Sequence, residues 1–250
     1  MKVSVIASGS KGNAAILLFN EKVVLIDAGI TCSYIKDKLE SLNITKIDYV
    51  LLTHVHVDHI GGLKQIIKTY NPKIFLSLGM YEELDIKLDN YEIIESDFNI
   101  GDLIVDIIKT SHDVKDSNGY IFNYNDRSVV YITDTGYINT KYHQKLKNKN
   151  MYIIESNHDI EKLMNGKYPY YLKQRILSDE GHLSNKDCSY YLKTFIGNLT
   201  TNIILIHLSE ENNSEELAYN ELKKVLNEIN RDDINIIISK QKERTDLIEI

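Results

Sequence analysis

Four side chains that can bind metal ions lie within six residues, directly after an apolar run. The run Tyr49-Val-Leu-Leu-Thr leads into His54-Val-His56-Val-Asp58-His59, which two glycines follow after one residue. Imidazole nitrogens and carboxylate oxygens are the ligands of zinc and of neighbouring first-row metals. In an extended segment alternate side chains share a side, so His54 and His56 can bind one ion. If the chain then turns into a helix, Asp58 and His59 face elsewhere and can hold a second ion.

A chance cluster of surface histidines is the plainer interpretation. Three of the eight histidines fall in this stretch, directly after an apolar run, and this density favours a metal site. Three more potential ligands, His112, Asp134 and His207, each follow a strand-like run, where loops gather functional side chains on a rigid scaffold. None of these three is decisive alone, since an Asp before Gly often forms a turn and a lone His often only packs.

Strand-like and helix-like segments must position these side chains. Aliphatic and β-branched runs between turn residues predict strands at 3–7, 15–19, 23–27, 49–53, 73–77, 103–109, 120–124, 129–133, 151–155, 203–207 and near 234–239. Apolar spacing predicts helices over 34–42, around 63–67 and over 214–230, the last capped by Asn213 or Ser214. So many strands, some separated by helices, favour two mixed sheets packed face to face and covered by helices.

Composition excludes several classes of protein. The chain has 250 residues, 43% of them hydrophobic and 26% charged, which excludes disordered and fibrous proteins. No internal repeat or long linker interrupts it, so a single domain over 1–250 is expected. Its apolar runs are strand length and its first residues lack the pattern of a signal peptide, so we expect no membrane partner and no export. Cys32 and Cys188 cannot form a disulfide framework, which fits a cytoplasmic location.

The histidine-rich stretch resembles the HxHxDH motif of the metallo-β-lactamase fold, and other segments resemble that superfamily in order. Residues 23–29 are similar to its first motif, whose Asp, here Asp27, orients the metal loop and is not a ligand. The third, fourth and fifth motifs correspond to the segments around His112, Asp134 and His207. The resemblance implies an α/β (α+β) fold, a four-layer αβ/βα sandwich of two mixed sheets flanked by helices.

The resemblance also implies a ligand set for two divalent metal ions. The first ion takes His54, His56 and His112, the second takes Asp58, His59 and His207, and Asp134 joins them. Five imidazoles suit Zn²⁺, while the two carboxylates also admit Mn²⁺ or Fe²⁺.

Several further segments narrow the branch of the superfamily. Segment 7–13 (ASGSKGN) and the segments that begin at Glu155 (ESNHD), Gly181 (GHLSN) and His207 (HLSEENN) are similar to the YycJ/WalJ-like branch. This likeness implies a phosphodiesterase or nuclease in which metal-bound hydroxide attacks phosphorus. It also implies exonuclease activity on double-stranded DNA in the 5′ to 3′ direction.

The same segments are similar to ribonuclease Z in their order, which implies that Glu155 and His182 act in proton transfer beside the metals. A histidine with an ordinary pKa of about 6.5 can protonate a leaving alkoxide at neutral pH, and a carboxylate can set its tautomer. Alternatively, His182 only lends a hydrogen bond where Ser184 caps a helix. The expected catalytic residues are His182, Asp58 and Glu155. The expected substrate contacts are Lys173, Arg175, Ser184 and Asn185.

Two other functions remain open. The same metal chemistry could hydrolyse a small ester, thioester or lactone, as in glyoxalases and lactonases, and would then need an acyl pocket. A degenerate fold could instead serve as a scaffold or regulator, although all seven expected ligands are present. The similarity of the Glu155 and His182 arrangement to ribonuclease Z favours the phosphodiesterase.

The formal net charge of −7 argues at first against a nucleic-acid partner, since such binding depends on Lys and Arg. Two divalent ions would carry four positive charges against the carboxylates of Asp58 and Asp134, which makes the pocket locally positive. Basic residues at 162, 167, 173 and 175 gather in the segment expected to border it, although a solvated helix face would look the same. We therefore expect a nucleic-acid substrate, DNA first, that is bound over a small area around the site.

Overall fold

Aliphatic and β-branched runs form most of the strands, as their preference for pleated, buried surfaces favours. The computed structural model describes residues 1–250 and groups them into two units. The first unit comprises Met1–Val105, Val114–Asn118 and Ser239–Ile250; the second comprises Asp106–Asp113 and Gly119–Ile238. Each unit has its own apolar core, and the single domain expected over 1–250 stays a prediction.

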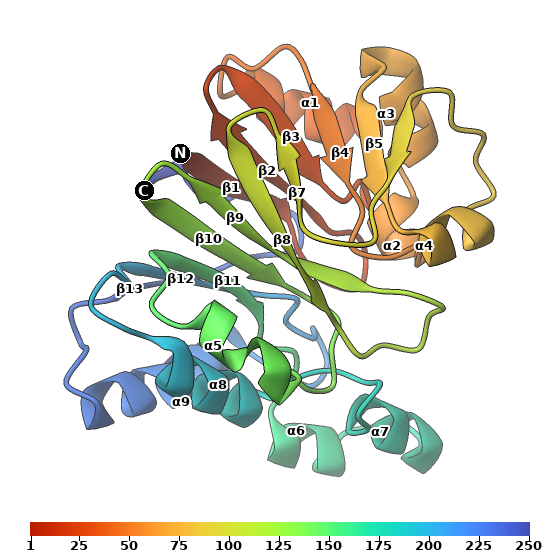
Figure 1. Cartoon of the computed structure of the whole chain (residues 1–250). Helices are drawn as coiled ribbons and strands as arrows, with labels where there is room; N and C mark the ends of the chain where they lie inside the picture. The colour runs from red at the N-terminus through yellow and green to blue at the C-terminus, as the bar shows by residue number, and fades with distance from the viewer. The chain divides into compact units, whose positions relative to one another are not determined.

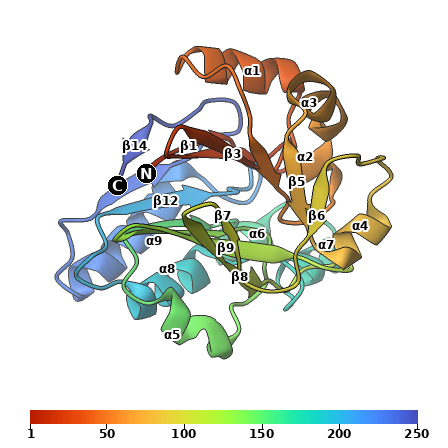
Figure 2. The same cartoon turned by 45° about the horizontal axis from the view of Figure 1, so that its top comes forward.

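A seven-stranded sheet forms the first unit. Its strands are β1 (Lys2–Ala7), β2 (Ala14–Phe19), β3 (Lys22–Ile26), β4 (Tyr49–Leu51), β5 (Lys73–Leu76), β6 (Tyr91–Ile93) and β14 (Ile248–Glu249). The first three form an antiparallel meander, and β4, β5 and β6 continue the sheet in parallel to β3. β14 pairs with β1, so the two ends of the chain lie side by side (Figure 2).

Helices pack on this sheet through apolar side chains. They are α1 (Cys32–Glu40), α2 (Val57–Ile60), α3 (Leu63–Tyr70) and α4 (Leu78–Glu83). Ile35 and Leu39 of α1 and Ile66 of α3 belong to one buried core, because the helical period places these positions on one face of each helix. α1 and α3 contact each other, as Figure 2 shows. β7 (Phe98–Ile100) then forms a hairpin with the start of β8 (Leu103–Lys109).

The sheet of the second unit is also mixed. After β8 come β9 (Asn118–Tyr124), β10 (Arg127–Ile132), β11 (Met151–Glu155), β12 (Asn202–Ile206) and β13 (Asn235–Ile238). β9 and β10 form an antiparallel hairpin, whereas β10 to β13 run parallel to one another. β11 is buried along its whole length, as the continuous apolar runs of parallel strands lead one to expect.

Helices of the second unit follow its parallel strands. They are a 3₁₀ turn (Thr140–Tyr142), α5 (His143–Leu146), α6 (Ile160–Asn165), α7 (Tyr170–Ile176), α8 (Asn185–Phe195) and α9 (Glu215–Glu228). Leu192 of α8 and Leu222 of α9 share a core with Tyr152 and Ile203 of the sheet, and Figure 1 shows both helices against β11 and β12. α7 contributes no buried residue. No helix in the chain combines the length and the apolar character that a membrane span requires.

The predicted strands and helices are all present, with ends that differ by a few residues. Ser214 caps α9 and accepts the N–H of Leu217, which decides between the two predicted caps. β6, β7 and β14 were missed, as were α4, α6 and α7, and of α8 only the start was expected. The missed strands have two or three residues each, too few to show an alternation of apolar and polar positions.

Candidate active site

The histidine-rich stretch lies just beyond β4, where the backbone leaves the sheet. We call His54, His56, Asp58 and His59 the first cluster. α2 begins at Val57, so the turn into a helix considered in the sequence is present. The ring centroids of His54 and His59 lie 3.9 Å apart, and those of His54 and His56 lie 4.9 Å apart. The stretch thus folds into one group of donors, with His54 and His59 buried.

Asp27 anchors the first cluster. It follows β3 directly, is fully buried, and has a left-handed backbone with φ 59°. Its Oδ1 accepts the Thr53 N–H at 2.8 Å, and its Oδ2 lies 2.7 Å from His59 Nδ1. Burial raises the pKa of Asp27, and the contact with His59 opposes that rise. Asp27 therefore fixes the His59 ring so that Nδ1 faces the carboxylate and Nε2 faces away.

Asn13 contacts the first cluster, a contact that could not be predicted from the sequence. Its Nδ2 lies 2.9 Å from His59 Nε2 and 3.3 Å from Asp58 Oδ2, and its backbone N–H donates to the Asp58 carbonyl at 2.7 Å. Gly29 passes through the same place, and a Cβ on it would lie 1.6 Å from the Asp58 carbonyl oxygen. Only glycine permits that approach of two backbones. The glycine-rich segment from Gly9 to Asn13 is visible in the sequence, but it does not reveal that Asn13 contacts Asp58, 45 residues further along the chain.

A second cluster lies within the second unit: His112, Asp134, Glu155, His182 and His207. Glu155 ends β11, and Asp134 and His207 follow β10 and β12, so these parallel strands bring the three side chains to one edge. Asp134 Oδ1 lies 3.5 Å from Nδ1 of both His182 and His207, and 3.9 Å from His112 Nε2. Asp134 and His207 have left-handed backbones, with φ of 50° and 58°, which turn them out of their strands.

Glu155 holds two histidines with one carboxylate. Its Oε1 lies 2.7 Å from His182 Nδ1 and 2.8 Å from His207 Nδ1, while its Oε2 accepts the N–H groups of Thr135 and Leu183 at 3.2 Å. Burial disfavours the carboxylate, but the charge and the hydrogen bonds of the histidines outweigh it and lower the pKa of Glu155 to about 2. Glu155 is therefore ionised and orients both rings.

The histidine rings of both clusters are oriented in the way that is typical of metal ligands. Four of the five expected ligand histidines have Nδ1 close to an oxygen: His54 to Thr53 Oγ1 (3.1 Å), His59 to Asp27 (2.7 Å), His112 to the Glu180 carbonyl (3.2 Å) and His207 to Glu155 (2.8 Å). Metal-binding histidines are characteristically oriented through the other ring nitrogen in this way. Burial also lowers the pKa of His112, which favours the neutral ring that a metal requires. The donor set therefore suits divalent ions bound through Nε2.

His182 differs from these ligand candidates in its exposure. Its side chain is 19% exposed, against 3% for His112 and 4% for His207. Its backbone N–H donates to the Ile176 carbonyl at 3.0 Å, which ties it to the end of α7. A histidine that is oriented by a buried carboxylate and open to solvent can exchange a proton with a bound substrate.

The four expected substrate contacts all have partners within the chain. Arg175 binds Asp113 through its guanidinium, and Lys173 Nζ donates to the carbonyls of Met164 and Gly166 at 2.6 and 2.8 Å. Ser184 caps α8 by accepting the Asp187 N–H at 3.0 Å, as the alternative interpretation of this segment expected. Asn185 is buried and bonded to Asn213. Their contact with substrate stays a prediction.

The comparisons with known proteins give the family. Residues 8–171 match the model of the Metallo-beta-lactamase superfamily. The chain belongs to the metallo-beta-lactamase superfamily. Exodeoxyribonuclease YycJ of Bacillus anthracis is 35% identical over 90% of this chain and 89% of its own length. Exodeoxyribonuclease WalJ of Streptococcus pneumoniae (strain D39) is 36% identical over 87% of this chain and 85% of its own length.

Structural similarity agrees with this membership of the metallo-beta-lactamase superfamily. The metallo-beta-lactamase fold protein YhfI of Bacillus subtilis superposes on this chain with a TM-score of 0.74 over 98% of both chains, at 18% sequence identity. The predicted fold class, two mixed sheets flanked by helices, is thereby confirmed, as is the YycJ/WalJ-like branch. Like other members of the metallo-beta-lactamase superfamily, the chain is a hydrolase that depends on divalent metal.

Proposed function

We propose that this chain is a nuclease that hydrolyses phosphodiester bonds of DNA from an end. Relatives named exodeoxyribonuclease match it over 90% and 87% of its length. The observation that carries the proposal is the Glu155–His182 pair, in which a buried carboxylate orients a partly exposed histidine. Such a pair supplies the proton that a departing alkoxide needs, whereas a thioester has a better leaving group and needs it less.

Two divalent ions belong to the proposed site. The assignment of ligands follows the family motifs. His54, His56 and His112 bind the first ion, Asp58, His59 and His207 bind the second, and Asp134 binds both. When bound, such ions lower the pKa of water and neutralise charge on the phosphate. Five imidazoles among seven ligands favour Zn²⁺, with Mn²⁺ or Fe²⁺ as alternatives.

The protein's own groups have separate roles in the proposed reaction. Asp27 and Glu155 hold ligand rings in position through the contacts of 2.7 Å to His59 and 2.8 Å to His207. His182 donates a proton to the leaving oxygen, and Glu155 stabilises the imidazolium before that transfer. Asp58 is a metal ligand in this proposal. Because its side chain is 26% exposed, it can also contact the substrate.

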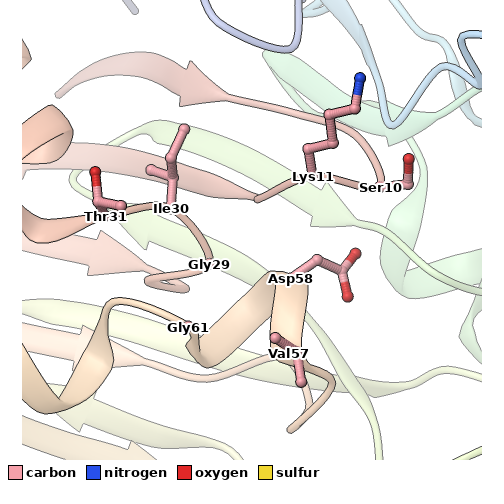
Figure 3. Close-up of a pocket in the computed structure, with 8 residues that line it drawn as sticks. All are labelled: Ser10, Lys11, Gly29, Ile30, Thr31, Val57, Asp58 and Gly61. Atoms are coloured by element: carbon pink, nitrogen blue, oxygen red, sulfur yellow. The ribbon is translucent and has the colours of Figure 1, made fainter.

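A cavity in the first unit is large enough to hold more of a substrate than one phosphate group. Figure 3 shows it opening beside Asp58, between the Ser10–Lys11 turn and the Gly29-to-Thr31 segment. Its volume of about 360 Å³ falls in the range of about 300–1,000 Å³ that is usual for small-molecule sites. We propose that a nucleotide of the substrate strand lies here.

A pair of small substrates tests the proposal. The protein, loaded with Zn²⁺ or Mn²⁺, is assayed with bis(p-nitrophenyl) phosphate and with S-lactoylglutathione at equal concentration. We expect turnover of the phosphodiester to exceed that of the thioester. Faster hydrolysis of the thioester would overturn the proposal in favour of the ester-hydrolase alternative. A chain that binds less than one metal ion after reconstitution and hydrolyses neither would be a scaffold instead.

A further inference from the structure

A second cavity lies within the second unit and is lined by cationic and hydroxyl groups. Its residues come from two segments, the end of β8 and the segment after Asp134. They are Lys109, Thr110, Ser111, Tyr137, Asn139, Lys141 and Tyr142. No Asp or Glu lines the cavity, although the chain as a whole has a net charge of −7. Lys109 and Lys141 give the lining positive charge, which favours an anion in this cavity.

The size of the cavity limits its occupant. Its volume is about 130 Å³, below the range of about 300–1,000 Å³ that holds a drug-sized ligand. A nucleoside does not fit such a volume, but a phosphate group does. Its hydroxyls and amide, from Thr110, Ser111 and Asn139, are groups that donate hydrogen bonds to phosphate oxygens.

Both walls of the cavity continue into the second cluster. Ser111 directly precedes His112, and Tyr137 comes three residues after Asp134. Two hydrogen bonds of 3.0 Å join the walls, from Ser111 N–H to Thr135 Oγ1 and from Gly136 N–H to the Ser111 carbonyl. A group held in the cavity is therefore fixed relative to His112 and Asp134.

Lys141 is available to such a group. Its Nζ lies 4.8 Å from the centre of the Tyr142 ring, a cation–π contact, and it makes no ion pair with a carboxylate. The side chain is exposed and the Tyr142 ring sets its direction, so it can approach a phosphate with little rearrangement.

We propose that this cavity, the Lys109–Lys141 cavity, binds a phosphate group of the DNA strand next to the bond that is cleaved. The inference rests on the proposed nuclease function and adds a subsite to it. The phosphate is either the terminal 5′-phosphate or an internal one, and both are bound by the same lysines and hydroxyls. The cavity would position the strand without taking part in the chemistry.

The test removes both lysines. Lys109→Ala/Lys141→Ala should raise KM for duplex DNA about tenfold, leave kcat nearly unchanged, and lower the slope of log KM against log salt by about one. Lys109→Arg/Lys141→Arg keeps the charge and should retain most of the binding. Lys147→Ala/Lys224→Ala removes the same charge from exposed positions of this unit and should leave KM near the wild-type value.

Two further readouts separate this inference from the proposed function. Turnover of bis(p-nitrophenyl) phosphate, which lacks a neighbouring phosphate, should be equal in the wild type and the alanine pair. Binding of phosphorothioate DNA, which resists hydrolysis, should weaken about tenfold in the alanine pair even if no DNA is cleaved. An effect confined to 5′-phosphorylated ends identifies a terminal phosphate, and an equal effect on 5′-hydroxyl ends identifies an internal one. Unchanged KM and unchanged binding in the alanine pair would overturn the inference.

Discussion

Asp27 binds no substrate in the proposed reaction, yet it sets the position of a ligand. Asp27→Asn puts an amide where Oδ2 lies 2.7 Å from His59 Nδ1, and an amide cannot reproduce every contact of that carboxylate. Loss of a carboxylate that orients a metal-binding histidine lowers metal affinity about 10- to 100-fold. Competition with a chromophoric chelator measures this. Asp48→Asn, near the surface of the same unit, should leave affinity unchanged, and equal affinities in wild type and Asp27→Asn would remove Asp27 from the site.

His182 should affect rate and not metal content. We expect His182→Ala to retain the metal complement of the wild type and to lose about 10²- to 10⁴-fold in kcat on DNA, the contribution of a general acid. His143→Ala, which removes a histidine packed between Tyr191 and Phe195, is the control for loss of an imidazole. Loss of metal in His182→Ala would make it a ligand instead.

At the scale of elements, strong local patterns could be predicted and tertiary contacts could not. The apolar run before His54 predicts β4, and the stripe through Leu222 and Leu226 predicts α9. α7 could not be found in this way because it has only seven residues and buries none of them, too short a segment to show a helical repeat. The role of Asn13 depends on folding that brings it against Asp58, which no local pattern encodes.

The seven expected ligands and Asp27 could be proposed from the sequence because their order along the chain is that of the family, and their roles stay a prediction. The residues that contact these expected ligands are harder to predict from the sequence. Thr53 and Asn157, which contact Asp27 and His207, have residue types common in any loop. The left-handed backbone of His207 is likewise a product of its surroundings, since local sterics disfavour it.

Ser184 tests whether the start of α8 has a structural or a substrate role. Ser184→Ala removes the cap that accepts the Asp187 N–H and should lower the free energy of unfolding by about 1 kcal/mol. Urea denaturation measures the loss, with the exposed Ser33→Ala as a control expected to change by less than about 0.5 kcal/mol. A raised KM for DNA with unchanged stability would support the substrate contact predicted from the sequence instead.

The whole molecule is acidic, and its cationic groups are local. With a net charge of −7, binding away from the site should be weak. We expect the affinity for long duplex DNA without accessible ends to have a salt slope equivalent to only one or two phosphates. Anisotropy titrations between low and moderate salt measure that slope. A slope equivalent to six or more phosphates would indicate an extended DNA track and contradict a site-centred footprint.

Hydrolysis of DNA from an end, with a requirement for metal, is the central claim. Linear duplex DNA labelled at one end and closed circular DNA of the same sequence are incubated with chelator-stripped protein and with protein reloaded with Zn²⁺ or Mn²⁺. The predicted result is release of nucleotides from the linear DNA only after reloading, with the circle intact. Cleavage of the circle as fast as the linear DNA, or no cleavage of either by protein that has bound its metal, would contradict the claim.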